Sequence, residues 1–427
     1  MKPIYAGLML GCAVMAGSSL FAQTRARVSP ALVFTHAHVL DGTGRSYDDA
    51  SVVVRDGRIV SVGAAPADLP RGATRIDARG MTVLPGYIDT HKHVMDGDGV
   101  KYLQETAARN MQDYLDAGFT TLQSCGDPLE PIVELRRRLA SGEVRGPRLF
   151  TSGRVPLARG TPTTPGVDPA RTDVSRPPLR PTAPALGIPE AETRAAVQRL
   201  AAAGVDAIKT VMLTTPGGPE IGTLSVVVDE AKKHGLRTLT HAVTTVDMVA
   251  AIEGGTTVLV HTPHIGWVNE TQGAQRAAAA GIPVLSTLGI FVPAFNEAEP
   301  AFFRDNQAYP EEHLWSAGQG PVNGRLLALA GVTYAFGTDT RFAPRFALWH
   351  ELRPLQLMFS NSDIVKILTR NAALSLGKGA ELGTIEAGKI ADLVMVGGDP
   401  LKGAHHLMDV RLVVKDGVIV SDQRKAH

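Results

Sequence analysis

Short apolar runs separated by turn residues mark both ends of the chain. Such runs, bounded by Gly, Asp and Pro, are typical of short strands in antiparallel sheets. Near the N-terminus they cover 31–40, 50–55 and 58–62, and near the C-terminus 391–396, 410–415 and 418–420. The Asp-Gly pairs at 56–57 and 416–417 each predict a hairpin turn. The pattern therefore predicts one small β-sandwich built from both ends of the chain.

The middle of the chain alternates strand-like and helix-like segments. Eight apolar runs end near His93, Cys125, Gly153, Thr210, His241, His261, Leu288 and Asp339. Helical periodicity occupies 103–117, 132–141, 190–203, 224–234, 247–253 and 322–329. Eight such repeats predict a (β/α)8 barrel of the α/β class. A doubly wound open sheet is the alternative, and it ranks lower because it would spread the strand ends that a barrel brings to one mouth.

These patterns divide the 427 residues into four segments. The expected segments are a signal peptide at 1–22, sandwich strands at 23–82, the barrel at 83–378 and further sandwich strands at 379–427. A short apolar stretch followed by small residues predicts cleavage after Ala22 and hence a periplasmic or secreted protein. A lipid anchor on Cys12 is not favoured, because Met9 fits a lipoprotein signal poorly.

The composition of the chain gives no support to several classes of partner and to an internal disulfide. The net charge of +1 and the absence of a basic run give no indication of a nucleic-acid or anionic-membrane partner. Removal of the signal peptide would leave Cys125 as the sole cysteine, so no internal disulfide is expected. Its apolar surroundings predict a buried side chain rather than a nucleophile.

Two histidines, His91 and His93, end the first barrel strand with i, i+2 spacing. Alternate residues of a strand share one face, so both imidazoles can reach one divalent metal. His241 and His261 close later strands in the same way and could bind a second metal. Another His-x-His pair, His36 and His38, precedes the barrel and is interpreted as structural or exposed.

Lys209 and Asp339 complete a set of six candidate ligands. A lysine in an apolar strand is costly to bury, and an ammonium group has no lone pair for a metal. A carbamate formed from Lys209 and CO2 could bridge two cations, whereas the plain alternative is a lysine that extends to solvent. Asp339 closes the eighth strand, where a carboxylate could accept a proton from water and return it to a leaving nitrogen.

Candidate substrate contacts lie close to the ends of the predicted strands. Arg154 and Arg341 follow strand ends and could bind a substrate carboxylate, and His264 follows His261 closely. Two long loops, 154–189 and 289–320, are expected at the catalytic face of a barrel. Thirteen aromatic residues between 261 and 360 favour an apolar or aryl-accepting pocket, with packing around the barrel as the alternative.

Several motifs resemble the amidohydrolase superfamily over nearly the whole mature chain. They are Leu-Pro-Gly-Tyr-Ile-Asp-Thr-His-Lys-His at 84–93, Thr-Arg-Asn-Ala-Ala at 369–373 and Leu-Gly-Thr-Ile-Glu-Ala-Gly-Lys-Ile-Ala-Asp-Leu-Val at 382–394. The resemblance implies a metal site made of His91, His93, Lys209, His241, His261 and Asp339, with Lys209 carboxylated. Gly-Pro-Arg-Leu-Phe-Thr-Ser-Gly-Arg at 146–154 resembles the imidazolonepropionase-like and Xaa-Pro dipeptidase-like branch, which includes bacterial N-acyl amino acid and ochratoxin amidohydrolases. Where that branch often carries Gly-Gly-His-Gly, this chain has Gly-Thr-Pro-Thr-Thr-Pro at 160–165.

The expected function is therefore an exported amidohydrolase with two divalent ions, Zn²⁺ being the first choice. It would cleave an amide bond in a peptide-like or N-acyl amino acid substrate, including aromatic, ochratoxin-like ones, by attack of metal-bound hydroxide. The expected partner is a small-molecule substrate, and a homo-oligomer is expected. Three alternatives remain: a lactonase or organophosphate-type hydrolase on the same site, a site with one metal and an unmodified Lys209, and a metal-free binding scaffold.

Overall fold

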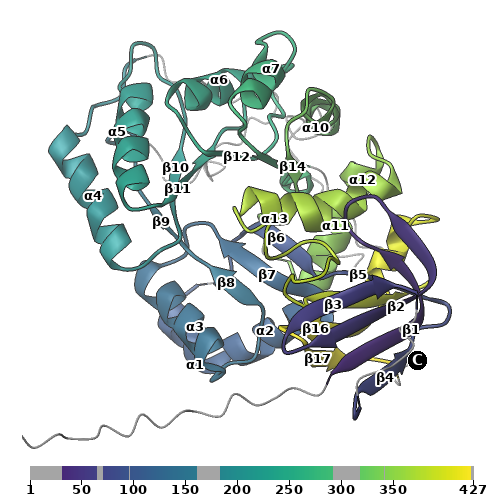
Figure 1. Cartoon of the computed structure of the whole chain (residues 1–427). Helices are drawn as coiled ribbons and strands as arrows, with labels where there is room; N and C mark the ends of the chain where they lie inside the picture. The colour runs from purple at the N-terminus through teal and green to yellow at the C-terminus, as the bar shows by residue number, and fades with distance from the viewer. Residues whose placement is uncertain are drawn as a thin grey trace, which may run out of the picture.

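The computed structural model describes residues 31–64, 71–95, 97–160, 183–291, 318–340 and 342–424. The expected signal peptide and most of the two long loops lie outside these ranges. Among the described helices, none combines the length and apolar character that a membrane crossing requires. Figure 1 shows two parts, a sheet formed by both ends of the chain and a larger barrel surrounded by helices.

The terminal sheet has eight strands in the order β17-β16-β15-β5-β1-β2-β3, with β4 beside β1. Its N-terminal strands are β1 (Leu32–Leu40), β2 (Ser46–Arg55), β3 (Arg58–Gly63), β4 (Thr74–Asp77) and β5 (Met81–Pro85). Its C-terminal strands are β15 (Leu393–Gly397), β16 (Val410–Lys415) and β17 (Val418–Asp422). Antiparallel pairing of β5 with β15 joins the two groups, which are the purple and yellow strands of Figure 1. Buried side chains from both groups, such as Phe34, Val52 and Val414, form one core.

Parallel strands form the barrel, and their ladders fall into two sheets. The first is β6 (Tyr87–Lys92), β7 (Phe119–Ser124) and β8 (Arg148–Phe150). The second is β9 (Ser152–Arg154), β10 (Ala207–Val211), β11 (Arg237–His241), β12 (Val258–Val260), β13 (Val284–Leu285) and β14 (Tyr334–Ala335). Segments β8 and β9 are two pieces of the predicted third strand, separated at Thr151.

Hydrogen bonds outside these ladders join the first and last barrel strands. Thr90 N donates to Phe336 O at 3.1 Å, and Asp339 N donates to His91 O at 2.8 Å. The predicted barrel is therefore confirmed, and the open doubly wound sheet is wrong. Small and medium apolar side chains fill its interior, among them Ala207, Leu239 and Ala335. Cys125 is fully buried in the same cluster, as its sequence context predicted.

Helices pack around the barrel strands (Figure 1). They are α1 (Gly99–Glu105), α2 (Ala107–Asp116), α3 (Leu129–Ser141), α4 (Glu190–Ala202), α5 (Glu220–Lys233), α6 (Thr245–Glu253), α7 (Gly273–Ala279), α10 (Gln319–Leu329), α11 (Pro344–Gln356), α12 (Asn361–Lys366) and α13 (Ala372–Ser375). Shorter helical turns are η1 (Leu288–Phe291), η2 (Ile367–Asn371) and η3 (Ala404–Met408). The predicted helix at 103–117 is two helices, because Thr106 leaves helical geometry between them.

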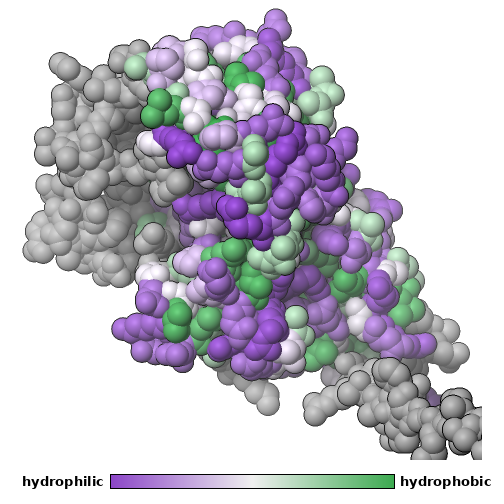
Figure 2. Space-filling view, turned by 90° about the vertical axis from the view of Figure 1, so that its left-hand side faces the viewer, coloured by the Kyte–Doolittle hydropathy of each residue, from purple (hydrophilic) through white to green (hydrophobic). Residues whose placement is uncertain are grey.

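The molecular surface in Figure 2 is mainly hydrophilic on the face shown, with hydrophobic residues in small groups. The described residues include exposed large apolar side chains, for example Leu186, Leu329 and Leu357. Scattered residues of this kind are normal for a folded protein.

Candidate active site

Five of the six candidate ligands gather where the barrel strands end. His91 lies in β6, His93 just follows it, and His241 ends β11. His261 follows β12 directly, and Asp339 follows β14. His261 and Asp339 adopt left-handed backbone conformations, with φ of 76° and 48°. Such conformations cost about 1–3 kcal/mol and concentrate at functional sites.

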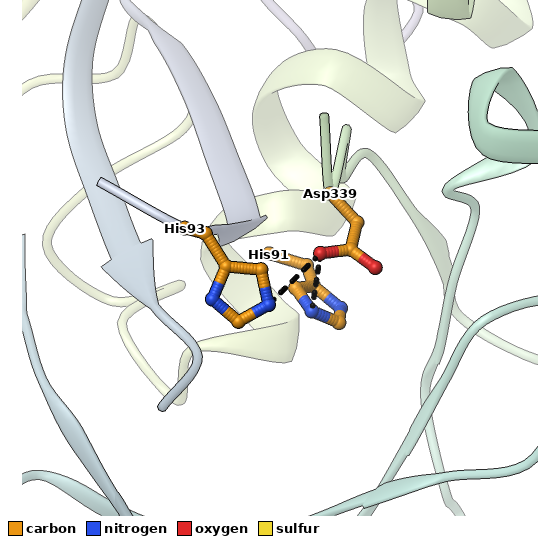
Figure 3. Close-up of side chains that lie close together, drawn as sticks. All are labelled: His91, His93 and Asp339. Carbon is orange, nitrogen blue, oxygen red and sulfur yellow. Dashed lines mark ion pairs between the residues drawn. The ribbon is translucent and has the colours of Figure 1, made fainter. Parts of the chain in front are cut away.

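The carboxylate of Asp339 lies among three imidazoles. Its Oδ1 is 3.3 Å from His91 Nε2 and 3.2 Å from His93 Nε2. Its Oδ2 is 3.8 Å from His261 Nε2. Figure 3 shows the first two contacts, made between the end of β6 and the segment after β14. One ligand atom from each of His91, His93 and Asp339 lies within 4.8 Å of the others, which is the spacing of a possible metal site.

Histidine rings continue this cluster across the barrel mouth. The ring centroids of His91 and His261 are 4.9 Å apart, and those of His261 and His241 are 4.2 Å apart. Lys209 is buried in β10, and β10 pairs with β11. Its charge would lower the pKa values of His91, His241 and His261, so it belongs to the same electrostatic cluster.

Burial gives these groups the protonation states that metal binding needs. It lowers the pKa of His91 to about 4 and those of His241 and His261 well below their usual range, so all three are neutral at neutral pH. Burial alone would raise the pKa of Asp339, but the histidines around it outweigh burial and hold its pKa well below the usual range. Neutral imidazoles and an ionised carboxylate are ligands for zinc and other divalent transition metals.

Hydrogen bonding supports the same interpretation. Both ring nitrogens of His91 and Oδ1 of Asp339 are buried and make no hydrogen bond of suitable geometry within the described residues. Most buried polar atoms in proteins have such a partner, so these three atoms need an explanation. The donor set therefore fits a divalent metal.

Lys209 also fits the chemistry expected of it. Burial is the largest effect on its ammonium group and lowers its pKa. Carbamate formation requires the neutral amine, because only that form has a lone pair for CO2. A low pKa increases the neutral fraction.

Two buried carboxylates that sequence analysis missed hold this region in place. Asp89 accepts hydrogen bonds from His91 N and Thr338 N, both at 3.1 Å, and from Thr338 Oγ1 at 2.6 Å. It thereby ties the strand carrying His91 to the segment carrying Asp339. Asp127 accepts from Val94 N at 2.9 Å and lies 3.9 Å from His93 Nδ1. The available sequence signals were the place of Asp127 just after β7 and the place of Asp89 inside β6, within the motif at 84–93.

The expected substrate contacts stay predictions. Arg154 ends β9, and its side chain packs against Gly126. A side chain in place of Gly126 would collide with Nε of Arg154. His264 is buried near His241 and influences the pKa of that residue. Arg341 lies outside the described residues. His36 and His38 lie in β1 of the terminal sheet, and His36 Nδ1 is 2.8 Å from Asp49 Oδ1.

Comparison with known proteins identifies the class to which this barrel and site belong. The model of the amidohydrolase family matches residues 82–420. Imidazolonepropionase of Thermoanaerobacter pseudethanolicus is 23% identical over 389 residues, which are 82% of this chain and 84% of that protein. A solved Xaa-Pro dipeptidase with bound methionine has a TM-score of 0.73 at 21% identity, covering 91% of this chain and 99% of its own. A. niger ochratoxinase has a TM-score of 0.70 at 21% identity, covering 92% and 96%.

The two structural matches establish the shared fold, and the family match extends over most of the chain. The architecture is that of a metal-dependent barrel hydrolase. The chain belongs to the amidohydrolase family and is a hydrolase of carbon–nitrogen bonds.

Proposed function

We propose that this chain is an exported enzyme with two divalent metal ions that hydrolyses an amide bond in a peptide-like or N-acyl amino acid. The observation that carries the proposal is the position of the Asp339 carboxylate, 3.3, 3.2 and 3.8 Å from the Nε2 atoms of His91, His93 and His261. His91 and His93 would hold one ion, and His241 and His261 the other. A carbamate on Lys209 would bridge them, and Asp339 would be a further ligand.

Bound divalent ions would supply an acidified water and a polarised substrate carbonyl. Asp339 accepts a proton from the attacking water as the new carbon–oxygen bond forms. It then donates that proton to the leaving nitrogen as the carbon–nitrogen bond breaks. The products are a carboxylic acid and an amine, so water is the only co-reactant.

The proposed substrate class rests on the relatives and on charge. One structural relative is named as a dipeptidase and another as an ochratoxinase. Arg154, at the end of β9, is close enough to Lys209 to lower the pKa of its ammonium group. A guanidinium in that position could hold the carboxylate of an N-acyl amino acid. The substrate proposal therefore combines an amide bond with a nearby carboxylate.

Metal content tests the proposed site directly. We expect elemental mass spectrometry of the mature protein, prepared without chelator, to find about two divalent ions per chain. His241→Asn should lose one of them, because it removes a single proposed ligand of the second ion. His36→Asn is the matched control, since it changes a His-x-His pair in the terminal sheet and should retain both. One ion in the wild type would remove the bridging role of Lys209, and none after addition of Zn²⁺ and bicarbonate would contradict the proposal.

Substrate assays test the reaction. The metal-loaded enzyme should hydrolyse N-acyl amino acids, including an N-acyl phenylalanine, faster than the matching amides without a carboxylate. Faster cleavage of lactones or phosphotriesters than of every amide would instead support the alternative hydrolase. The mass of the exported protein should correspond to a chain that begins at Gln23, and light scattering should show an oligomer.

A further inference from the structure

Thr287 has a strained conformation beside the proposed metal site. It follows β13, is fully buried, and has a φ of 41°. The left-handed region is unfavourable for a β-branched residue, so the surrounding structure must impose it. Thr287 N donates to Gly337 O at 3.0 Å. A side chain at Gly337 would crowd Thr287 Cγ2, at 3.3 Å, and His91 Cβ, at 3.0 Å.

The hydroxyl group of Thr287 contacts a proposed metal ligand. Its Oγ1 is 2.6 Å from Nδ1 of His261, while Nε2 of the same ring faces Asp339. A neutral imidazole carries one N–H, so the partner of one nitrogen determines the state of the other. If Nδ1–H donates to Thr287 Oγ1, Nε2 keeps the lone pair that a metal requires.

Helix α11 holds the backbone immediately after Thr287. Glu351 Oε1 accepts a hydrogen bond from Leu288 N at 2.8 Å, and Oε2 accepts one from Gly289 N at 2.6 Å. His350 Nε2 lies 2.7 Å from Gly289 O. Both side chains are almost fully buried. Three polar contacts from one helix thus converge on two consecutive residues, which limits how the preceding Thr287 can relax.

We propose that Thr287 is a positioning residue that holds His261 as its Nδ1–H tautomer with Nε2 directed at the metal, and that Glu351 holds Thr287 in the required backbone conformation. This inference rests on the proposed metal site. It assigns a role to a threonine and a glutamate that are distant in sequence from His261. It also explains why a β-branched residue is kept in a left-handed conformation: the contact with His261 depends on it.

Metal affinity of the apoprotein tests the role of Thr287 without using activity. Competition with a chromophoric chelator should show that Thr287→Val weakens binding of one Zn²⁺ by about 10–100-fold, the usual effect of losing a hydrogen bond to a metal-binding histidine. Thr287→Ser keeps the hydroxyl and should stay close to the wild type. Thr287→Gly also lacks the hydroxyl, but glycine accommodates the positive φ, so this variant should fold. Its affinity for Zn²⁺ should be reduced as in Thr287→Val.

Thr256→Val is the matched control, because Thr256 Oγ1 is buried and hydrogen-bonded to Thr240 Oγ1 at 2.7 Å. It should lower the thermal midpoint without changing Zn²⁺ affinity. Wild-type affinity in both Thr287→Val and Thr287→Gly would overturn the inference while leaving the proposed function intact. Absence of metal binding by the wild type would overturn both.

A double-mutant cycle tests the role of Glu351. Glu351→Gln replaces one acceptor oxygen by a donor and should weaken Zn²⁺ binding in the wild-type background. If Glu351 acts through Thr287, the same change should have no further effect in the Thr287→Gly background. If the two substitutions instead weaken Zn²⁺ binding independently, so that their fold-losses multiply in the double variant, Glu351 does not act through Thr287. That result would overturn this half of the proposal.

Discussion

Asp339→Asn should abolish most of the turnover while leaving the fold in place. Asparagine has nearly the same volume as aspartate and also tolerates the left-handed conformation seen here, with φ of 48°. The backbone hydrogen bond from residue 339 to His91 O, 2.8 Å long, is unchanged by the substitution. Any large effect must therefore come from the loss of the carboxylate.

The size of that effect follows from its contacts. The carboxylate faces three imidazoles within 3.8 Å, and its pKa is held well below the usual range, so the ionised form is the one lost. Proton transfer by a positioned side chain contributes about 10²–10⁴-fold to a rate. At about 1.4 kcal/mol per factor of ten, the barrier should rise by roughly 3–5 kcal/mol.

The assay compares kcat of the two proteins at saturating substrate after both are reconstituted to equal metal content. Equal metal content separates proton transfer from metal binding, and a thermal melt of each apoprotein checks the fold. A kcat within tenfold of the wild type, at matched metal content, would refute the role assigned to Asp339. A variant that cannot be loaded with metal would show that its main role is that of a ligand.

Two further predictions concern stability. Arg148 NH1 is 2.7 Å from Asp392 Oδ2, joining the barrel to the terminal sheet, and Arg148→Met should cost about 3 kcal/mol in urea unfolding because it leaves a buried carboxylate without its cation. A loss below about 1 kcal/mol would contradict this reasoning. Burial raises the pKa of Glu351 to about 8, from about 4.3 in an unfolded chain, so the protonated form is favoured by folding. The unfolding free energy of the wild type should therefore fall relative to that of Glu351→Gln as pH rises from about 5 to 8. If the unfolding free energies of the two proteins change equally with pH, the raised pKa of Glu351 is refuted.

The sequence by itself determined the architecture and most of the candidate ligands. Apolar runs reveal strands, and a polar residue at the end of such a run is recognisable without any distant partner. His91, His93, His241, His261 and Asp339 all have this local signature, and a barrel brings its strand ends to one mouth. Periodicity did not reveal the break between β8 and β9 or the division of the first predicted helix at Thr106, because each depends on a single residue.

Only the tertiary structure revealed how the ligands are held. Thr287 and Glu351 stand in ordinary local contexts, and their roles come from partners far along the chain. Asp89 joins its near neighbour His91 to Thr338, which lies 249 positions away. Thr287 lies 26 positions from His261, and Glu351 lies 63 positions from Leu288. Hydrophobic patterning specifies which face of a strand or helix is buried, but not which polar atoms meet across the barrel. Those contacts arise when the ring of strands closes and α11 packs against η1, which follows β13.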